Sequence, residues 1–201
     1  MPMIRETIVT TLSPEGKVHI APLGLIAEPQ RADGLGPEGD GWIIAPFRPS
    51  TTLDNLRANP HAVANFTDDV LIFAGCLTGN RDWPTRPATR VPGVVLDAAL
   101  AHAELKVDRV EEDEQRPRFH CKMVFEASHE PFQGFNRAQS AVIEAAILAS
   151  RLHMLPREKI ERELGYLQTA VEKTAGPREH EAWRLLVEKI EDHFKHAAGS
   201  G

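Results

Sequence analysis

The chain has 201 residues, of which 42% are hydrophobic and 26% charged, a composition typical of a folded protein and unlike that of a disordered one. This length suits one sizeable core, or a main domain with a smaller helical region, and argues against two large independent domains. The formal net charge of −6 argues against an extended basic surface for nucleic acid. Any anion must therefore bind at a local site.

Other patterns in the sequence indicate where in the cell the protein is located and which kinds of site it can contain. No apolar run approaches the roughly 18 residues needed to span a bilayer, and the first residues lack a signal-peptide pattern, so we expect a cytoplasmic protein without membrane contacts. Cys76 and Cys121 are the two cysteines and form no CxxC motif. We expect them to be buried and unreactive. The histidines show no metal-ligand spacing, so no metal site is expected.

The first half of the chain reads mainly as strands. Residues 4–12 are rich in Ile, Val and Thr, and SPEGK then supplies a turn before VHIAPLGLIA, so the pattern predicts a β-hairpin. Residues 28–41 are rich in Gly and Pro and predict a loop, whose role the sequence leaves open. The segment 41–47, GWIIAPF, predicts a strand. A short helix over 51–58 follows, ended by Asn59 and Pro60.

Residues 61–66, HAVANF, predict another strand, whereas the next part is harder to read. DDVLIFAGCL fits a helix or a strand, with Asp68 and Asp69 as its cap, and TGNRDWPTRPATRVPG predicts a loop. Residues 102–110 and 118–127 alternate as long strands joined across EEDEQRP. In the second, Phe119 and Cys121 share a face with Met123 and Phe125, which makes Cys121 a core residue.

These segments predict a fold of the α+β class. About six strands, mostly consecutive and joined by short turns, favour an antiparallel barrel over residues 1–131. The region 132–197 predicts helices that pack on the barrel and at a dimer interface. Its first helix, closed by Pro156, is apolar almost all round, so we expect it to pack at a subunit interface or beneath the last two helices. Those helices are predicted over 157–174 and 178–196.

The stretch FRPSTTLDNL, residues 47–56, is the strongest candidate for a binding site. A helix start exposes backbone N–H groups and a partial positive charge, and the hydroxyls of Ser50, Thr51 and Thr52 add donors. Arg48 would add a planar cationic fork. The residues alone leave a second interpretation open, in which Ser50 or Thr51 only caps the helix and Arg48 is a surface residue.

The order of these motifs resembles a known family. The hairpin strand VHIAPLG, the strand WIIAPF, the start RPSTT and the following NLRANPHAVANF are together similar to the flavin mononucleotide (FMN) binding split-barrel superfamily, which includes flavin reductases and pyridoxine-phosphate oxidases. This likeness covers roughly residues 4–127. With FQGFNRAQSAVIEAAILASRL and the helical tail, nearly the whole chain resembles the branch called domain of unknown function 447. No obvious Lys accompanies Arg48, and the insert at 28–41 is long, which leaves the substrate open.

The resemblance implies a homodimer of split barrels with FMN at the interface. It places one strand along the flavin ring and the helix start at the phosphate, with Asn55 as a further contact that could equally face the barrel. The implied cofactor-binding residues of these segments are His19, Ile20, Ala21, Pro22, Leu23, Phe47, Arg48, Ser50, Thr51, Thr52 and Asn55. Asn136 and Arg137 begin the long apolar helix, where we expect contacts to the cofactor from the second subunit, or else an ordinary helix cap.

The implied function is an FMN-dependent oxidoreductase acting on a small molecule, in which the flavin carries the redox chemistry. The sequence identifies neither the substrate nor a catalytic residue. Three alternatives stay open: a flavin-binding carrier or sensor without catalysis, a split barrel without cofactor that serves as an interaction module, and a site for another phosphorylated ligand, such as a deazaflavin or a pterin.

Overall fold

The computed structural model describes residues 3–27 and 41–199. Residues 28–40, where the sequence predicts a Gly-rich loop, lie outside the described residues. The chain divides into two compact units. The first consists of Met1–Thr67 and Asp82–Pro131, and the second of Asp68–Arg81 and Phe132–Gly201.

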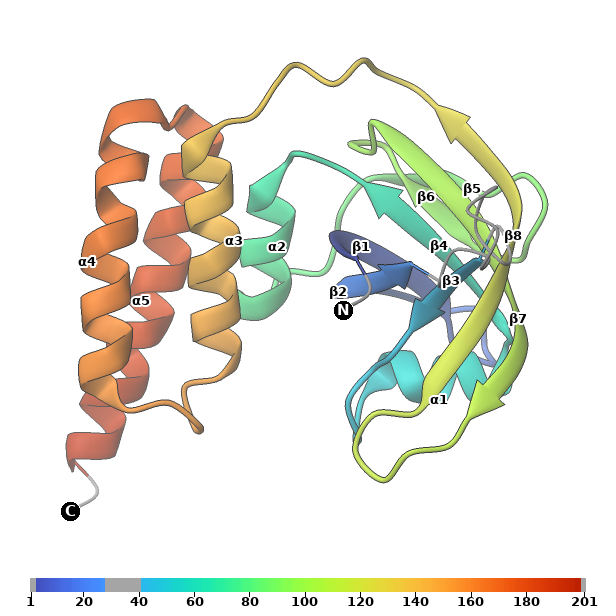
Figure 1. Ribbon diagram of the computed structural model, residues 1–201, viewed down its shortest axis with the longest axis horizontal. Helices are drawn as coiled ribbons and strands as arrows, with labels where there is room; N and C mark the ends of the chain where they lie inside the picture. The colour runs from blue at the N-terminus through green and yellow to red at the C-terminus, as the bar shows by residue number, and fades with distance from the viewer. Residues whose placement is uncertain (1–2, 28–40, 200–201) are drawn as a thin grey trace. The chain divides into compact units, whose positions relative to one another are not determined.

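The first unit is built on a closed barrel of six strands in the order β1-β2-β3-β8-β7-β4 (Figure 1). Each strand is antiparallel to its neighbours, and β1 closes the barrel by pairing with β4. The predicted antiparallel barrel of about six strands is therefore confirmed. The strands are β1 Ile4–Leu12, β2 Val18–Ala27, β3 Gly41–Ile44, β4 His61–Phe66, β7 Ala101–Glu111 and β8 Arg118–Ser128.

Strand β3 is shorter than the sequence predicts, because it ends at Ile44 and not at Phe47. The carbonyl oxygen of Ala45 accepts hydrogen bonds from the Arg116 side chain, at 3.2 Å from Nε and 2.9 Å from Nη2. Pro46, the next residue, has no N–H to donate to a neighbouring strand. The segment that leads to Arg48 is therefore held by a side chain and not by the sheet.

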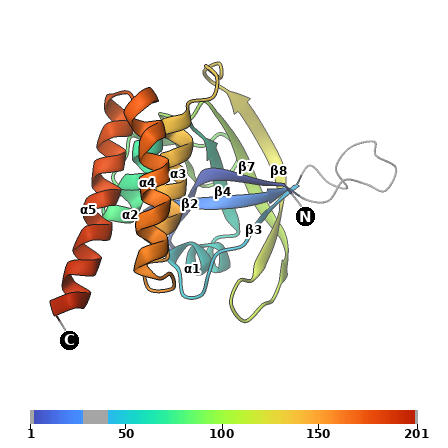
Figure 2. The ribbon, with the colours of Figure 1, turned by 60° about the vertical axis from the view of Figure 1, so that its left-hand side comes forward.

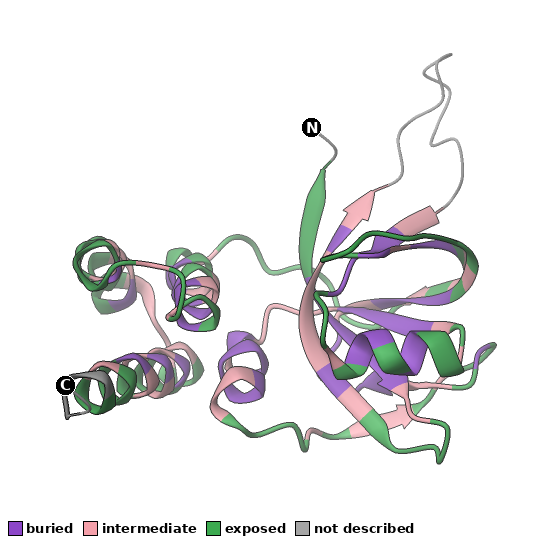
Figure 3. Cartoon of the chain, turned by 90° about the horizontal axis from the view of Figure 1, so that it is seen from below, coloured by how far each residue is buried: buried purple, intermediate pink, exposed green. Residues whose placement is uncertain are grey.

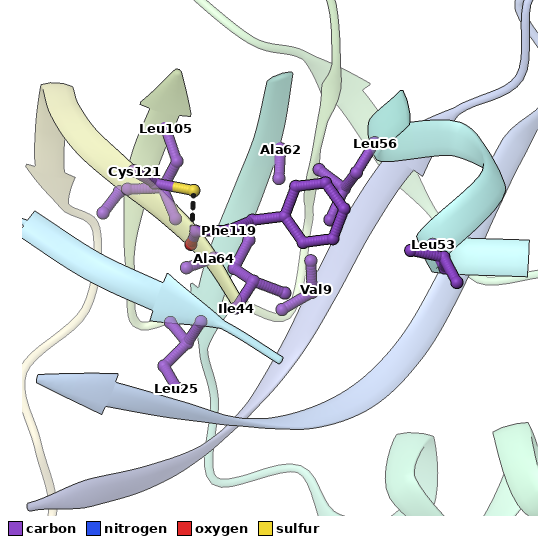
Figure 4. Close-up of a cluster of buried hydrophobic side chains, with 11 residues drawn as sticks. Val9, Leu25, Ile44, Leu53, Leu56, Ala62, Ala64, Leu105, Phe119 and Cys121 are labelled. Atoms are coloured by element: carbon purple, nitrogen blue, oxygen red, sulfur yellow. Dashed lines mark hydrogen bonds between the residues drawn. The ribbon is translucent and has the colours of Figure 1, made fainter. Parts of the chain in front are cut away.

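The barrel core joins strand residues to the helix α1, Thr51–Ala58. Leu53 and Leu56 lie at i and i+3 on the buried face of α1 and pack with Val9, Ile44 and Phe119 (Figure 4). Cys121 lies in the same core, as the alternation of β8 predicts, while Cys76 is buried in the second unit. Neither cysteine forms a disulfide in the part of the chain that the structure describes.

A separate sheet of two short strands, β5 Thr85–Pro87 and β6 Val94–Leu96, belongs to the same unit. Asn65 Oδ1 accepts a hydrogen bond from the N–H of Leu96 (2.8 Å), and Thr10 Oγ1 donates to the carbonyl of Val94 (2.5 Å). The stretch predicted as a loop thus contains β5. Three-residue strands carry too little alternation to be recognised in a sequence.

The second unit is helical and consists of α2 Val70–Thr78, α3 Arg137–Ser150, α4 Arg157–Thr174 and α5 Pro177–Gly199 (Figure 2). Helix α3 packs against α2, α4 and α5, which confirms that the last two helices cover its apolar surface. Helix α2 is buried along most of its length (Figure 3). None of the helices in the described ranges combines the length and apolar character that a membrane crossing needs.

Helix α3 ends at Ser150, earlier than the sequence predicts. The N–H of Arg151 bonds to the carbonyl of Leu148, three residues back (3.0 Å), and the hydroxyl of Ser150 donates to the carbonyl of Ile147 (2.8 Å). These bonds tighten the last turn and satisfy carbonyl groups that a continuing helix would otherwise bond. The five residues before Pro156 therefore form turns and a bend.

Asp69 caps α2, as its position before the VLIF segment predicts. Its carboxylate accepts from the N–H of Leu71 (3.2 Å) and forms an ion pair with Arg178 at the start of α5. We expect Asp69→Ala to lower the free energy of unfolding by about 1 kcal/mol, because both the cap and the ion pair are lost. Asp69→Asn keeps a capping oxygen, so its loss should be smaller. Urea unfolding of both variants measures the difference, and equal losses would contradict the role of the cap.

Candidate phosphate and cofactor site

The start of α1 has the geometry of an anion site. Ser50 is the N-cap, and its hydroxyl oxygen accepts from the N–H of Leu53 (3.3 Å). The N–H groups of Thr51 and Thr52, the two residues before Leu53, have no acceptor among the described residues. Thr51 is exposed and Thr52 is buried. The N–H and the hydroxyl of the exposed Thr51 therefore remain available to an anion.

Arg48, three residues before α1, is bound to the connection between β7 and β8. Its backbone N–H donates to the carbonyl of Gln115 (2.9 Å), and its Nε donates to the carbonyl of Asp113 (3.2 Å). Its Nη2 contacts a carboxylate oxygen of Glu112 at 2.8 Å, and 37% of the side chain is exposed. The structure thus fixes the backbone of Arg48 and leaves its guanidinium partly open to solvent.

Phe47 lies beside Arg48 with 55% of its surface exposed. The guanidinium carbon of Arg116 is 4.3 Å from the centre of its ring, a cation–π contact. The same Arg116 side chain holds the carbonyl of Ala45. Arg116, in the loop between β7 and β8, therefore holds the Phe47 ring in place, and the ring presents an apolar surface.

Asn55 faces the barrel. It is buried, and its amide donates to the hydroxyl of Thr11 on β1 at 3.0 Å. Thr11 is in register with His19 on β2, so Asn55 ties α1 to the hairpin at the position of the predicted cofactor strand. Asn59 adds two bonds from the end of α1 to the carbonyls of Leu12 (3.1 Å) and Ser13 (2.9 Å). The helix start and the hairpin are therefore held together.

Strand β2 pairs with β1 along its length and, among the described residues, with β3 near its end. Hydrogen bonds from Ala27 to Met3 and from Ser13 to Lys17 (both 2.9 Å) show that odd-numbered residues of β2 bond to β1. The backbone groups of Ile20, Pro22 and Gly24 consequently point to the opposite edge. Among the described residues, β3 is in register with β2 at Ile26 and Ala27. Of the predicted strand contacts, Ile20 is buried, whereas the others are half-buried: His19, Ala21, Pro22 and Leu23.

Asn136 and Arg137 belong to the second unit, whereas the residues just described belong to the first. Asn136 is the N-cap of α3: its Oδ1 accepts from the N–H groups of Ala138 (2.8 Å) and Gln139 (3.4 Å), and its amide donates to the carbonyl of Thr174 (2.9 Å). Arg137 is exposed. The ordinary cap is thus present, and contact of these residues with a cofactor remains a prediction.

Three charged residues of the site were not anticipated from the sequence. Glu112 Oε2 accepts a hydrogen bond from Arg57 (2.8 Å) as well as from Arg48. Arg116 holds the segment that leads from β3 to Arg48. The Arg57 guanidinium, with that of Arg48, holds the pKa of Glu112 below its usual value. The motif EEDEQRP signalled only a turn, because nothing local indicates which residues a turn will contact.

A second polar cluster lies at the other end of β7. The buried carboxylate of Glu104 accepts from three backbone N–H groups, and His102 connects it to His129, with 2.8 Å between Nδ1 and Nε2. Strand β7 runs from Ala101 to Glu111, about 30 Å at the rise of a strand, so this cluster is remote from Glu112. Within residues 3–27 and 41–199, no three His, Cys, Asp or Glu side chains are grouped to hold a metal ion.

The closed six-stranded barrel, with α1 between β3 and β4 in the chain, has the split-barrel fold of FMN-binding proteins. The chain belongs to the family described as protein of unknown function DUF447, whose N-terminal domain matches residues 5–130 and whose second part matches residues 136–188. The sequence matches no curated protein.

Solved structures with the same fold include flavoproteins. The FMN-bound DUF447 protein MM1853 from Methanosarcina mazei has a TM-score of 0.78 at 19% identity, over 94% of this chain and 96% of that one. Flavoredoxin from Methanosarcina acetivorans has a TM-score of 0.52 at 13% identity, over 67% and 73% of the two chains. The 2-nitrobenzoate 2-nitroreductase of Pseudomonas fluorescens has a TM-score of 0.50 at 19% identity, over 64% and 66%. At these identities the likeness shows the fold.

Proposed function

We propose that this protein binds FMN, with the phosphate at the start of α1 and the flavin ring along β2. The observation that carries the proposal is the start of α1, where the N–H groups of Thr51 and Thr52 have no acceptor in the part of the chain that the structure describes, beside a partly exposed Arg48. Helix starts of this kind bind phosphate groups. The FMN-bound family member with the same fold over nearly the whole chain supports the choice of ligand.

The residues present fit such a ligand. Arg48 supplies a permanent positive charge, the hydroxyl of Thr51 adds a donor, and Ser50 holds the first turn of α1 in shape through its bond to Leu53. Backbone groups of Pro22 and Gly24, on the edge of β2 that faces away from β1, can bond to the polar edge of a ring, while Phe47 supplies an apolar surface. The bound flavin would supply the hydride or electron transfer.

We further propose that the protein is an oxidoreductase of the flavin reductase and pyridoxine-phosphate oxidase class, and that it works as a homodimer on a small molecule. A nitroreductase among the structures with the same fold supports the reaction class. Asn136 and Arg137 would reach the cofactor of the second subunit. In this assignment the chain binds and orients the flavin, and no side chain has to act as a proton donor.

The test is a titration of purified protein with FMN, followed by quenching of flavin fluorescence and by the visible spectrum. Saturable quenching supports the proposal, and its absence overturns it. Reduction of the bound flavin by NADH or NADPH then separates an enzyme from a carrier or sensor. Sedimentation of the protein with and without FMN measures the dimer.

A further inference from the structure

Glu112, at the start of the loop between β7 and β8, bridges two arginines of the site. Its Oε2 lies 2.8 Å from Nη2 of Arg48 and 2.8 Å from Nη2 of Arg57, and its Oε1 lies 2.9 Å from the same Arg57 nitrogen. All three side chains are more than a third exposed. The carboxylate therefore occupies the position that an external anion would take between two guanidinium groups.

The loop that carries Glu112 is held in place by other bonds. The carbonyl of Gln115 accepts from the backbone N–H of Arg48 (2.9 Å), and Arg116 bonds to the carbonyl of Ala45. Within the loop, the carboxylate of Asp113 accepts from the N–H groups of Gln115 (2.8 Å) and Arg116 (2.6 Å). The loop consequently does not need the charge of Glu112 to keep its shape.

A carboxylate and a phosphate are recognised by guanidinium in the same way, through charge-assisted N–H···O bonds. Arg48 directs its Nε to Asp113 and its Nη2 to Glu112, so part of its donor set is already occupied. We infer that Glu112 competes with the cofactor phosphate for Arg48, and thereby sets how strongly the site discriminates FMN from riboflavin, which lacks the phosphate. This inference rests on the proposed function.

The balance of charge gives the direction of the effect. Arg48, Arg57 and Glu112 together carry one net positive charge, and a neutral residue at position 112 raises this to two. Asp54, in the first turn of α1, and Asp113 keep their negative charges in either case. Removal of the Glu112 charge therefore favours an anion at Arg48, whether the phosphate displaces the carboxylate or binds beside it.

The test compares FMN and riboflavin with the Glu112→Gln variant. Glutamine keeps the size of the side chain and one carbonyl oxygen but carries no charge. We expect its dissociation constant for FMN, measured by fluorescence quenching at low ionic strength, to be about three- to tenfold lower than that of the natural protein. The constant for riboflavin should not change, and added salt should reduce the FMN effect. Glu114→Gln, an exposed residue of the same loop, is the matched control.

The outcomes separate the two proposals. FMN affinity that is equal or weaker in Glu112→Gln, or an equal shift for FMN and riboflavin, overturns the competition while FMN binding itself stands. An equal shift in Glu114→Gln also overturns it, because the effect would then be one of overall charge. If neither the natural protein nor the variants bind FMN, the proposed function falls and the competition with it.

Discussion

Replacement of Arg48 by alanine is expected to weaken FMN binding by about ten- to a hundredfold. The guanidinium supplies charge-assisted hydrogen bonds to a phosphate, and bonds to charged groups contribute about 1.5–3 kcal/mol each. The dissociation constant should rise for FMN and stay unchanged for riboflavin, because only the phosphate contacts Arg48. Fluorescence titration with both flavins measures this.

Arg90→Ala serves as the control for this experiment. Arg90 is exposed on the loop before β6, and only its backbone N–H makes a hydrogen bond that the structure shows. Its replacement removes the same charge from the barrel unit and should leave both affinities as they are. If Arg48→Ala binds FMN as tightly as the natural protein does, Arg48 is not a ligand of the phosphate, although other residues at the start of α1 can still hold it.

Glu104→Gln is expected to destabilise the protein by about 3 kcal/mol. The Glu104 carboxylate is 0% exposed and accepts from the N–H groups of Thr89 (2.6 Å), Arg90 (2.5 Å) and Val91 (2.9 Å). A glutamine has one acceptor oxygen, and its NH₂ group would face N–H donors without a partner, which is costly in a buried site. For a chain of this size the midpoint of thermal unfolding should fall by about 6–12 °C.

Glu126→Gln is the matched control for Glu104→Gln. Glu126 lies on β8 opposite Ala103 and is exposed, so the loss of its charge should change the unfolding temperature by about 1 °C or less. If Glu104→Gln is as stable as Glu126→Gln, the three hydrogen bonds do not hold the loop before β6.

The stabilisation by Glu104 should depend on pH. Burial opposes ionisation of Glu104, but the N–H groups of Thr89, Arg90 and Val91, together with His102, outweigh burial and lower its pKa below the ordinary 4.5. A carboxyl group whose pKa is lower in the folded state stabilises the protein above its unfolded pKa and loses this effect as the pH falls through the folded one. The difference in unfolding free energy between the natural protein and Glu104→Gln should therefore be constant above about pH 5 and shrink below pH 4.5.

Local signals in the sequence were sufficient for much of the barrel unit. The bounds of α1 could be predicted because Ser50 caps its start and Asn59-Pro60 ends it, and both signals lie within a few residues of the helix. The long strands β7 and β8 were predicted from alternation, and β1 and β2 from runs of apolar and β-branched residues on either side of a turn, whereas β3 was predicted too long. There, the end of the strand is set by Arg116, more than seventy positions away in the chain, and no local pattern reports such a contact.

The rest depended on contacts between distant residues. Helix α2 could not be distinguished from a strand, because VLIFAGCL is apolar on all sides and its neighbours decide its form. Helical spacing also left the direction of Asn55 open, until its bond to Thr11 placed it toward the barrel. The role of Glu112 could not be predicted for the same reason, because Glu112 lies 64 positions from Arg48 and 55 from Arg57 in the chain.

Two separate stretches of the chain form the helical unit, and this affects the order in which the protein folds. Helix α2 is made between β4 and β5, but its packing partners α3 and α5 follow more than fifty residues later in the chain. Until they are synthesised, Val70 and Ala74 have no apolar surface of their own unit to cover them. The loops that must close before this packing forms are long, so the helical unit has to assemble after the chain of the barrel is complete. During synthesis, α2 is consequently an apolar segment that stays without its packing partners and is exposed to aggregation.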